Sequence, residues 1–499
     1  MSELHFDSQS SQNNPDVSAV SQHQNILSVN PYEFMEHTYY GTGGYRNGTY
    51  LINHQRESYY DSRREYSSYR NFMRPIIRSL IEPVFTEKAK RVVLDANQND
   101  MSGTMFSGFL DDADNNGTSL QEFTEDVLTN ARLLGCTFVV MDNFPYHSPD
   151  KQTALDNRIY PYLYQVKPQG VKDYTTDRFG KITSITLEDE PLITKHGFSI
   201  TKEDRYRLWT DTYSVLLKKD NSGTYTEVEA RVEHGLGVIP VIPVYIGKKK
   251  SQSDILVDPP MYDLGRLNCS LYNKDSEIRD LERSQAFAIF FLQTEEGGNV
   301  TLGSHNALFL PMETTIPPGF ASPDPSIMTT LADSCEKLRE SIFMIAEQNG
   351  VQGVRSAKSG VAIQWDFFAV ESQLKKTSKV ATDFELALSD LFKLYTNEEF
   401  EYIVEYPSDF QPGNQGEVLD TYKKVFDLNP PEELKRVLWE KTTRMLMSDE
   451  SEEDVQVVVS AIYAETTDDD IVTDEETKAT EELTNMEDTG KEDQTLTSI

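Results

Sequence analysis

The chain has 499 residues, a formal net charge of −35 and a hydrophobic content of 38%. This length predicts two to four structural units, and the acidity argues against a protein that binds nucleic-acid phosphates tightly, because such binding needs surplus lysine and arginine. The cysteines are too few and too far apart for a disulfide framework or a zinc site, which indicates a reducing compartment; they are Cys136, Cys269 and Cys335.

The first 30 residues are rich in serine, glutamine and asparagine, so we expect them to be disordered and not to be a secretory signal. The longest apolar run, residues 238–246, is interrupted by two prolines and is much shorter than the roughly 20 residues that a membrane span needs. The sequence therefore predicts a soluble protein with no membrane partner.

Residues 57–82 are predicted to form one helix that ends before Pro83. Its candidate packing residues are Tyr59, Tyr66, Phe72 and Ile76.

A second helix is predicted to begin at Thr118 or Ser119, because Gln121 and Glu122 complete the spacing of a capping box. The apolar residues on one face of this helix are Phe123, Val127, Ala131 and Leu134. Gly135 is predicted to end the helix, and the following run CTFVVMD to form a buried strand.

Residues 158–246 contain short apolar runs separated by turn sequences such as DRFGK and DNSGT, which predicts a largely antiparallel β unit. The predicted strands are 160–166, 181–188, 206–210, 213–218, 225–232 and 238–246.

Helical periodicity then returns, and it predicts long helices over 261–292, 326–348 and 364–396. A segment with several glycines and prolines separates the first two helices, and a glycine-containing loop, NGVQGVRSAKSG, separates the last two. A strand over 401–410 and three short helices follow. From Asp449 to the end, the chain has 18 acidic residues and only two lysines, so we expect the tail after about residue 465 to be disordered.

No motif specifies catalysis or cofactor binding. The residues that begin like an EF-hand loop are Asp112, Asp114, Asn116 and Gly117. A calcium loop needs a bidentate glutamate at its twelfth position, where this chain has Phe123 with Glu122 one place early, so we favour an acidic turn with a helix cap. The glycines of YGTGGYRNG lack a phosphate-loop lysine, and the eight histidines form no metal-binding pattern. We therefore expect a protein that is not an enzyme and needs no cofactor.

The stretch over residues 56–78 holds six arginines and four tyrosines in an otherwise acidic chain. In a helix, Glu57, Asp61 and Glu65 would meet much of this charge locally. Tyrosines in such a setting more often anchor an interface than stack on bases, so we favour packing against neighbouring subunits or within the fold and keep direct DNA contact as the alternative. The candidate subunit-interface residues are Arg63, Arg64, Arg70, Tyr66 and Tyr69.

The order of parts resembles that of the portal proteins of tailed double-stranded DNA bacteriophages. A mixed α/β region leads to a long helix, an irregular insert, a second helix, a loop, a third helix, a strand and a small helical end. The similarity extends over about residues 30–460, and the segments that carry it are 50–85, 115–142, 235–245, 263–292 and 331–351.

The resemblance implies an α+β fold with the portal architecture of wing, stem, clip, tunnel loop and helical crown. The implied divisions are a disordered N-terminus at 1–30, the first part of the wing at 31–258, a stem helix at 259–293, the clip at 294–323, a second stem helix at 324–349, the tunnel loop at 350–361, the long helix and strand of the wing at 362–412, the crown at 413–464 and a disordered acidic tail at 465–499.

Members of this family form a ring at a unique capsid vertex, twelve subunits in the virion, and serve as the conduit for DNA packaging and ejection. The resemblance therefore implies a homo-oligomer, expected to be a dodecamer, located in the virion and, during assembly, in the host cytoplasm. It also implies several partners: the terminase large subunit, a head–tail adaptor or tail proteins at the clip, the major capsid and scaffolding proteins, and double-stranded DNA in the channel.

The resemblance places Arg355 and Lys358 in the tunnel loop, facing the DNA channel. Lys375, Lys376 and Lys379 are further candidates for the channel surface or, alternatively, ordinary solvated charges of a helix. Two other readings of the chain stay open: another oligomeric virion protein, such as a head–tail connector or scaffold component, and a hydrolase whose site forms only in three dimensions.

Overall fold

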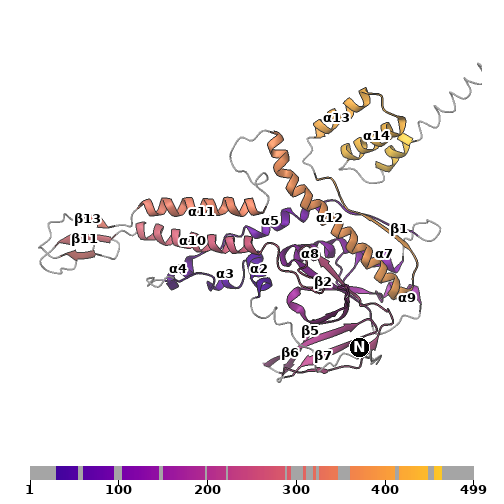
Figure 1. The fold of residues 1–499 in the computed structure, drawn as a ribbon, viewed down its shortest axis with the longest axis horizontal. Helices are drawn as coiled ribbons and strands as arrows, with labels where there is room; N and C mark the ends of the chain where they lie inside the picture. The colour runs from indigo at the N-terminus through magenta and orange to yellow at the C-terminus, as the bar shows by residue number, and fades with distance from the viewer. Residues whose placement is uncertain are drawn as a thin grey trace, which may run out of the picture. The chain divides into compact units, whose positions relative to one another are not determined.

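The structure is a computed structural model that describes residues 30–53, 60–94, 104–144, 150–196, 199–220, 223–286, 289–293, 307–310, 319–321, 325–346, 360–410, 415–447 and 455–463. The chain divides into two compact units between Phe410 and Gln411. The described part is a mixed α/β fold with mainly antiparallel sheets, as predicted (Figure 1). The predicted disordered tail at 465–499, and the predicted disordered N-terminus apart from its last residue, lie outside the described residues.

The described residues before the first strand form short helices, namely α2 (Pro31–Tyr40), α3 (Gly44–Asn47), α4 (Tyr60–Tyr66), α5 (Met73–Ser79) and α6 (Glu82–Phe85). The prediction of one helix over 57–82 is therefore wrong. A proline is tolerated only in the first turn of a helix because it has no N–H to donate to the preceding turn. Pro75 and Pro83 each lie in the first turn of a new helix, which explains the interruptions.

The second predicted helix is confirmed as α8 (Leu120–Leu134), which follows strand β1 (Lys90–Leu94) and helix α7 (Met105–Asp111). Its capping box is complete, because Ser119 Oγ accepts from Glu122 N at 3.3 Å and Glu122 Oε2 accepts from Ser119 N at 3.1 Å. Gly135 then turns the chain with φ +88°, a conformation that favours glycine.

The predicted strand CTFVVMD is confirmed as β2 (Cys136–Asp142), the middle strand of an antiparallel sheet with the order β10-β2-β3. Its neighbours are β10 (Val241–Tyr245) and β3 (Tyr162–Val166), and helix α9 (Lys151–Asp156) precedes β3. Val139 and Met141 pack into the main helical core, whereas Phe138 and Val140 pack into a second core on the opposite face. Burial on both faces explains why this strand is a continuous apolar run.

The second sheet has the order β4-β5-β6-β7-β8, with β9 also pairing with β7. Its strands are β4 (Val171–Thr176), β5 (Ile182–His196), β6 (Ser199–Thr210), β7 (Tyr213–Lys219), β8 (Tyr225–Glu227) and β9 (Val232–Glu233), and the 3-10 turn η2 (Pro168–Gly170) precedes them. The antiparallel β unit is thus confirmed. Strand β4 was not predicted, because Val171 is its only fully buried residue and the rest of VKDYTT is mostly polar.

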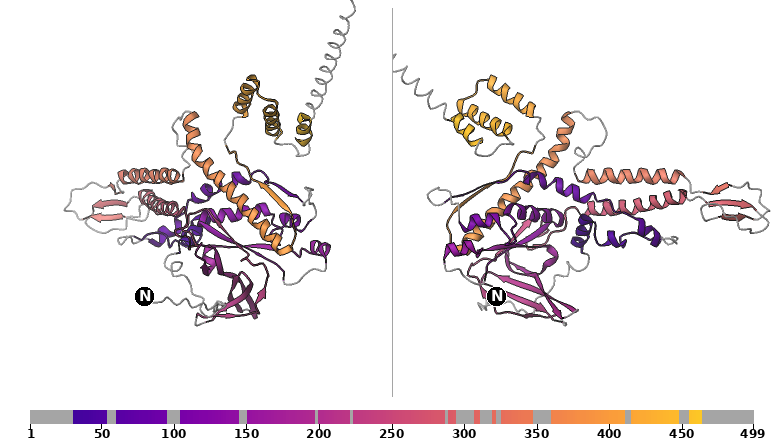
Figure 2. Two further views of the ribbon diagram at one scale, coloured as in Figure 1. Left: turned by 45° about the vertical axis from the view of Figure 1, so that its right-hand side comes forward. Right: turned by 180° about the vertical axis from the view of Figure 1, so that it is seen from behind.

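The next two long helices are α10 (Tyr262–Ala286) and α11 (Pro325–Ile345), which lie side by side (Figures 1 and 2). In sequence they flank a three-stranded sheet of β11 (Ile289–Gln293), β12 (Ala307–Leu310) and β13 (Gly319–Ala321). The prediction that the first helix continues to residue 292 is wrong. The apolar run IFFLQ is instead the central strand of this sheet, parallel to β12 and antiparallel to β13.

The third long helix is confirmed as α12 (Gly360–Thr396), which begins four residues earlier than predicted. It packs against α8, against strands β2 and β10 of the β10-β2-β3 sheet, and against strand β14 (Glu401–Glu405). Strand β14 pairs with β1 in an antiparallel register that places Val92 opposite Ile403. The two-stranded sheet therefore joins the early and late parts of the first unit.

The second unit contains α13 (Gln415–Asp427), α14 (Glu432–Leu446) and a helical segment over 455–463, in agreement with the short helices predicted here. The Phe426 and Trp439 rings lie 5.2 Å apart, and Tyr463 donates a hydrogen bond to Glu440 at 3.0 Å. These contacts join the three helical segments within the unit.

Candidate functional site

Arg63, from the basic and aromatic stretch, is buried within its own chain with only 4% of its surface exposed. Its Nη1 donates to Ser276 Oγ at 2.7 Å, and its Nη2 donates to the Ile52 carbonyl oxygen at 2.7 Å. Hydrogen bonds from a charged donor are stronger than neutral ones, so Arg63 holds α4 and the preceding segment onto α10.

Tyr69 is also enclosed by its own chain. Its hydroxyl lies 2.8 Å from both the Thr38 carbonyl oxygen and Asn268 Oδ1, and its ring stacks on Tyr45 with the centroids 3.9 Å apart. Burial raises the pKa of the Tyr69 hydroxyl well above its ordinary value. Asn268 in turn donates to the Arg70 carbonyl oxygen, so this tyrosine cluster fixes the segment between α4 and α5 against α10.

Tyr66 forms a second contact with α10. Its hydroxyl donates to Asp280 Oδ1 at 2.5 Å, and the Arg283 guanidinium lies 4.5 Å from the centre of its ring. Burial, together with the hydrogen bond to Asp280, raises the pKa of Tyr66 to about 12. Tyr66 therefore stays protonated and acts as a hydrogen-bond donor at neutral pH.

Arg64 and Arg70 are the more exposed of the candidate interface arginines. The Arg64 side chain is 44% exposed and pairs with Asp61 at 3.5 Å, whereas the Arg70 side chain is 51% exposed and pairs with Asp275 at 3.3 Å. Asp275 also approaches Arg339 of α11 at 3.8 Å, so this carboxylate lies between two arginines. The subunit-interface role of the five candidate residues stays a prediction.

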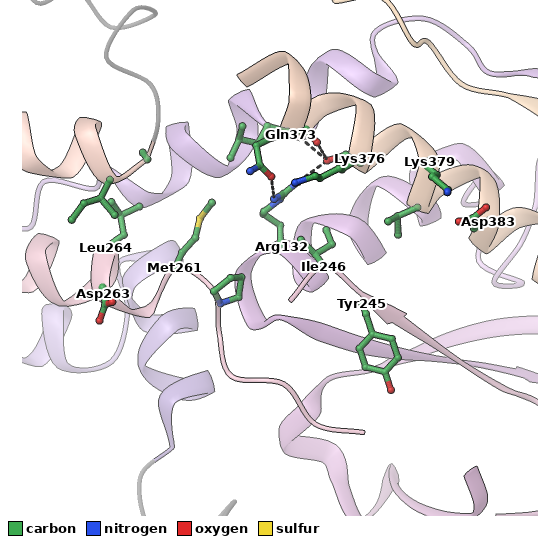
Figure 3. A pocket seen from close by; sticks show the side chains of 16 residues that line it. Arg132, Tyr245, Ile246, Met261, Asp263, Leu264, Gln373, Lys376, Lys379 and Asp383 are labelled. Carbon is green, nitrogen blue, oxygen red and sulfur yellow. Dashed lines mark hydrogen bonds between the residues drawn. The ribbon is translucent and has the colours of Figure 1, made fainter. Parts of the chain in front are cut away.

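The three lysine candidates lie on consecutive turns of α12 and differ in their surroundings. Lys375 pairs with Glu371, one turn away, at 2.6 Å. Lys376 and Lys379 are exposed and form no ion pair with any residue that the structure describes; both line a pocket of about 560 Å³ (Figure 3). The sequence therefore located these lysines on one helix. All three line a second pocket together with Glu371, and Lys375 differs from the other two in its ion pair with that carboxylate.

Arg132 of α8 lines the same pocket and was not predicted as a site residue. It is 5% exposed, with Nη1 donating to Gln373 Oε1 at 3.1 Å and Nη2 donating to Thr377 Oγ1 at 2.7 Å (Figure 3). Burial lowers the pKa of Arg132 to about 10. The sequence held one signal, because Arg132 follows the apolar Leu128 by one turn of the predicted helix.

A second arginine was also missed, Arg91 of β1, whose side chain is 14% exposed. It forms a bidentate ion pair with Glu385 of α12, with Nε–Oε2 and Nη2–Oε1 distances of 2.9 and 2.7 Å. Glu385 is fully buried and accepts further hydrogen bonds from Tyr402 at 2.6 Å and Tyr406 at 2.5 Å. This network joins α12 to the β1–β14 sheet.

The carboxylates of the acidic turn before α8 form hydrogen bonds and an ion pair with other groups of the same chain. Asp114 Oδ1 accepts from Asn116 N at 2.9 Å, and Asp112 Oδ1 accepts from Gly117 N at 3.0 Å. Asp112 also pairs with Arg158 at 3.1 Å. The interpretation as an acidic turn with a helix cap is therefore confirmed, and the cap is Ser119. Among the described residues, no group of side chains could hold a metal ion.

The predicted tunnel-loop residues Arg355 and Lys358 lie outside the described residues, so their role stays a prediction. Within the described ranges, no helix is long and apolar enough to cross a membrane.

No protein-family model matches the chain, and no curated protein matches it. Similar solved structures include a chain from the neck of an empty GTA particle, with 12% identity, coverage of 73% of this chain and 88% of that chain, and a TM-score of 0.38. Another is a chain from the virion of a native gene transfer agent (GTA) particle, with 10% identity, coverage of 82% and 94%, and a TM-score of 0.40. At this identity and TM-score, neither similarity assigns a function to the chain.

Proposed function

We propose that the chain is a portal protein of a tailed double-stranded DNA bacteriophage. In this proposal it is a ring-forming structural component, not an enzyme, and DNA is packaged and ejected through the ring. The observation that carries the proposal is the sequence of α10, a small three-stranded sheet, α11 and the long helix α12. This is the order that the resemblance to portal proteins implies for stem, clip, stem and wing.

The surface of the α10–α11 pair supports a ring. Cys335 and Ile342 of α11 are buried in the main core, whereas other large apolar residues of the same helix are exposed: Ile327 at 50%, Met344 at 63% and Ile345 at 53%. Several exposed apolar residues on one helix favour cover by another protein surface. In a closed ring, every copy would supply that cover to its neighbour.

The charge distribution suits a conduit that does not trap its cargo. The proposal places Arg355 and Lys358 along an otherwise acidic channel and keeps Lys375, Lys376 and Lys379 as further candidates for its surface. A few cations in such a wall make weak, salt-screened contacts with phosphates, and an acidic wall limits tight binding. DNA would then be slowed or held without being immobilised.

The partners follow from the same proposal. The packaging motor, through the terminase large subunit, and the tail adaptor would bind the ring, the adaptor at the clip. The major capsid and scaffolding proteins would surround the ring at one capsid vertex. The protein would be found in the host cytoplasm during assembly and in the mature virion.

Negative-stain electron microscopy of the purified protein, with sedimentation velocity, tests the proposal. We expect rings with a central hole. Met344→Lys should reduce ring yield, because it places a charge on the exposed apolar surface, whereas Ala332→Lys adds the same charge at an exposed small residue of α11 and should have little effect. A stable monomer would contradict the proposal, and a closed oligomer without a channel would favour another virion component.

A further inference from the structure

The pocket of about 560 Å³ beside α8 and α12 gathers three cationic side chains, Arg132, Lys376 and Lys379 (Figure 3). Its lining also includes Tyr245 and residues from the first turn of α10 and the end of α11. All of these residues belong to the first unit. The pocket is therefore a feature of one compact part of the chain.

The guanidinium of Arg132 is buried without a carboxylate partner. Both of its hydrogen-bond acceptors, Gln373 Oε1 and Thr377 Oγ1, are neutral, and its Nε is enclosed without an acceptor. A buried charge is normally paired, because removing it from water without compensation costs several kcal/mol. Arg91, whose side chain is 14% exposed, shows the usual arrangement, because it forms a bidentate ion pair with the fully buried Glu385.

The acidic residues of the pocket do not pair with Arg132. Asp263 and Asp383 also line it, but no carboxylate of a described residue lies within ion-pairing distance of Arg132, Lys376 or Lys379. In Figure 3, Asp383 lies next to Lys379 at one end of the pocket, whereas Arg132 lies beneath Gln373. The cations thus exceed the acids by one, and the most buried cation has no acid beside it.

We propose that this pocket is a binding site for a single oxyanion, either a carboxylate from a second copy of this chain or a free phosphate. Arginine offers a planar fork of N–H donors that matches both groups, and the lysines supply mobile charges at the opening. The chain itself carries 82 acidic residues, so a neighbouring copy offers many carboxylates. The proposal rests on the pocket alone and does not require a portal function.

The first experiment measures binding of inorganic phosphate to the full chain by thermal shift, with sodium chloride adjusted to constant ionic strength. We expect the Tm to rise with phosphate and to saturate. The Lys376→Ala/Lys379→Ala variant changes only exposed side chains and should weaken the apparent affinity roughly tenfold or more, because it removes two charge-assisted contacts. Lys375→Ala is the matched control, since Lys375 pairs with Glu371 and does not line this pocket, and it should respond like the parent.

The second experiment identifies the source of the oxyanion by sedimentation velocity of the same proteins. If a neighbour's carboxylate occupies the pocket, the double lysine variant assembles less and phosphate shifts the parent toward smaller species. If the ligand is free phosphate, assembly is unchanged while the thermal response is lost in the double variant. The proposal is overturned if the parent, the Lys375→Ala control and the double variant share the same phosphate response and the same oligomer distribution.

Discussion

Replacing Arg91 with methionine is expected to lower the free energy of unfolding by about 3–5 kcal/mol, the usual cost of removing one partner from a buried ion pair. Glu385 is fully buried, and the substitution removes both of its contacts with the guanidinium while the hydroxyls of Tyr402 and Tyr406 remain. These two hydroxyls still donate hydrogen bonds to Glu385, but they do not neutralise its negative charge.

Urea denaturation at a fixed protein concentration measures this change, with the oligomeric state of each variant checked by sedimentation. Lys202→Met is the matched control, because the Lys202–Asp204 pair is 3.1 Å long but its side chains are 61% and 54% exposed. An exposed pair contributes at most about 1 kcal/mol, so this control should change stability little.

The double variant Arg91→Met/Glu385→Gln tests the cause of the loss. It removes both charges and keeps an amide oxygen for the tyrosine hydroxyls, so its cost should be at least about 1 kcal/mol smaller than the sum of the two single costs. The reasoning is refuted if the costs are additive, or if Arg91→Met is as mild as Lys202→Met.

Four further predictions concern the remaining sites. Arg63→Ala should lower the free energy of unfolding by about 1.5–3 kcal/mol, because it removes the charge-assisted hydrogen bonds of a buried arginine to Ser276 and to the Ile52 carbonyl oxygen. Arg64→Glu should leave stability nearly unchanged and impair ring assembly in sedimentation; normal assembly would remove Arg64 from the interface. Ser119→Ala should cost about 1 kcal/mol in urea denaturation, because it removes the N-cap of α8, and an unchanged midpoint would contradict that role. Arg355→Glu/Lys358→Glu should leave rings intact and reduce the retention of full-length genomes late in packaging; retention equal to the parent's would argue against a channel contact.

Local sequence patterns were sufficient for much of the fold. The spacing of Ser119 and Glu122 with Gly135 predicted α8 and its boundaries, because capping and the left-handed turn involve only neighbouring residues. Apolar periodicity likewise predicted the long helices and the antiparallel β unit. The polar sequence of β4 and the apolar sequence IFFLQ were misread, because pairing with other strands outweighed their local patterns.

The surroundings of the charged residues depended on segments far apart in the chain. Arg91 and Glu385 are 294 positions apart, and only their meeting across β1 and α12 turns two ordinary charges into a buried pair. Arg63 similarly requires Ser276 of α10, which changes a candidate surface arginine into a buried one. Arg132 shows the opposite outcome, since the fold buries it against neutral acceptors. Sequence specified the type and spacing of these side chains, whereas tertiary packing determined which of them are desolvated, because the partners and the exclusion of water come from distant elements.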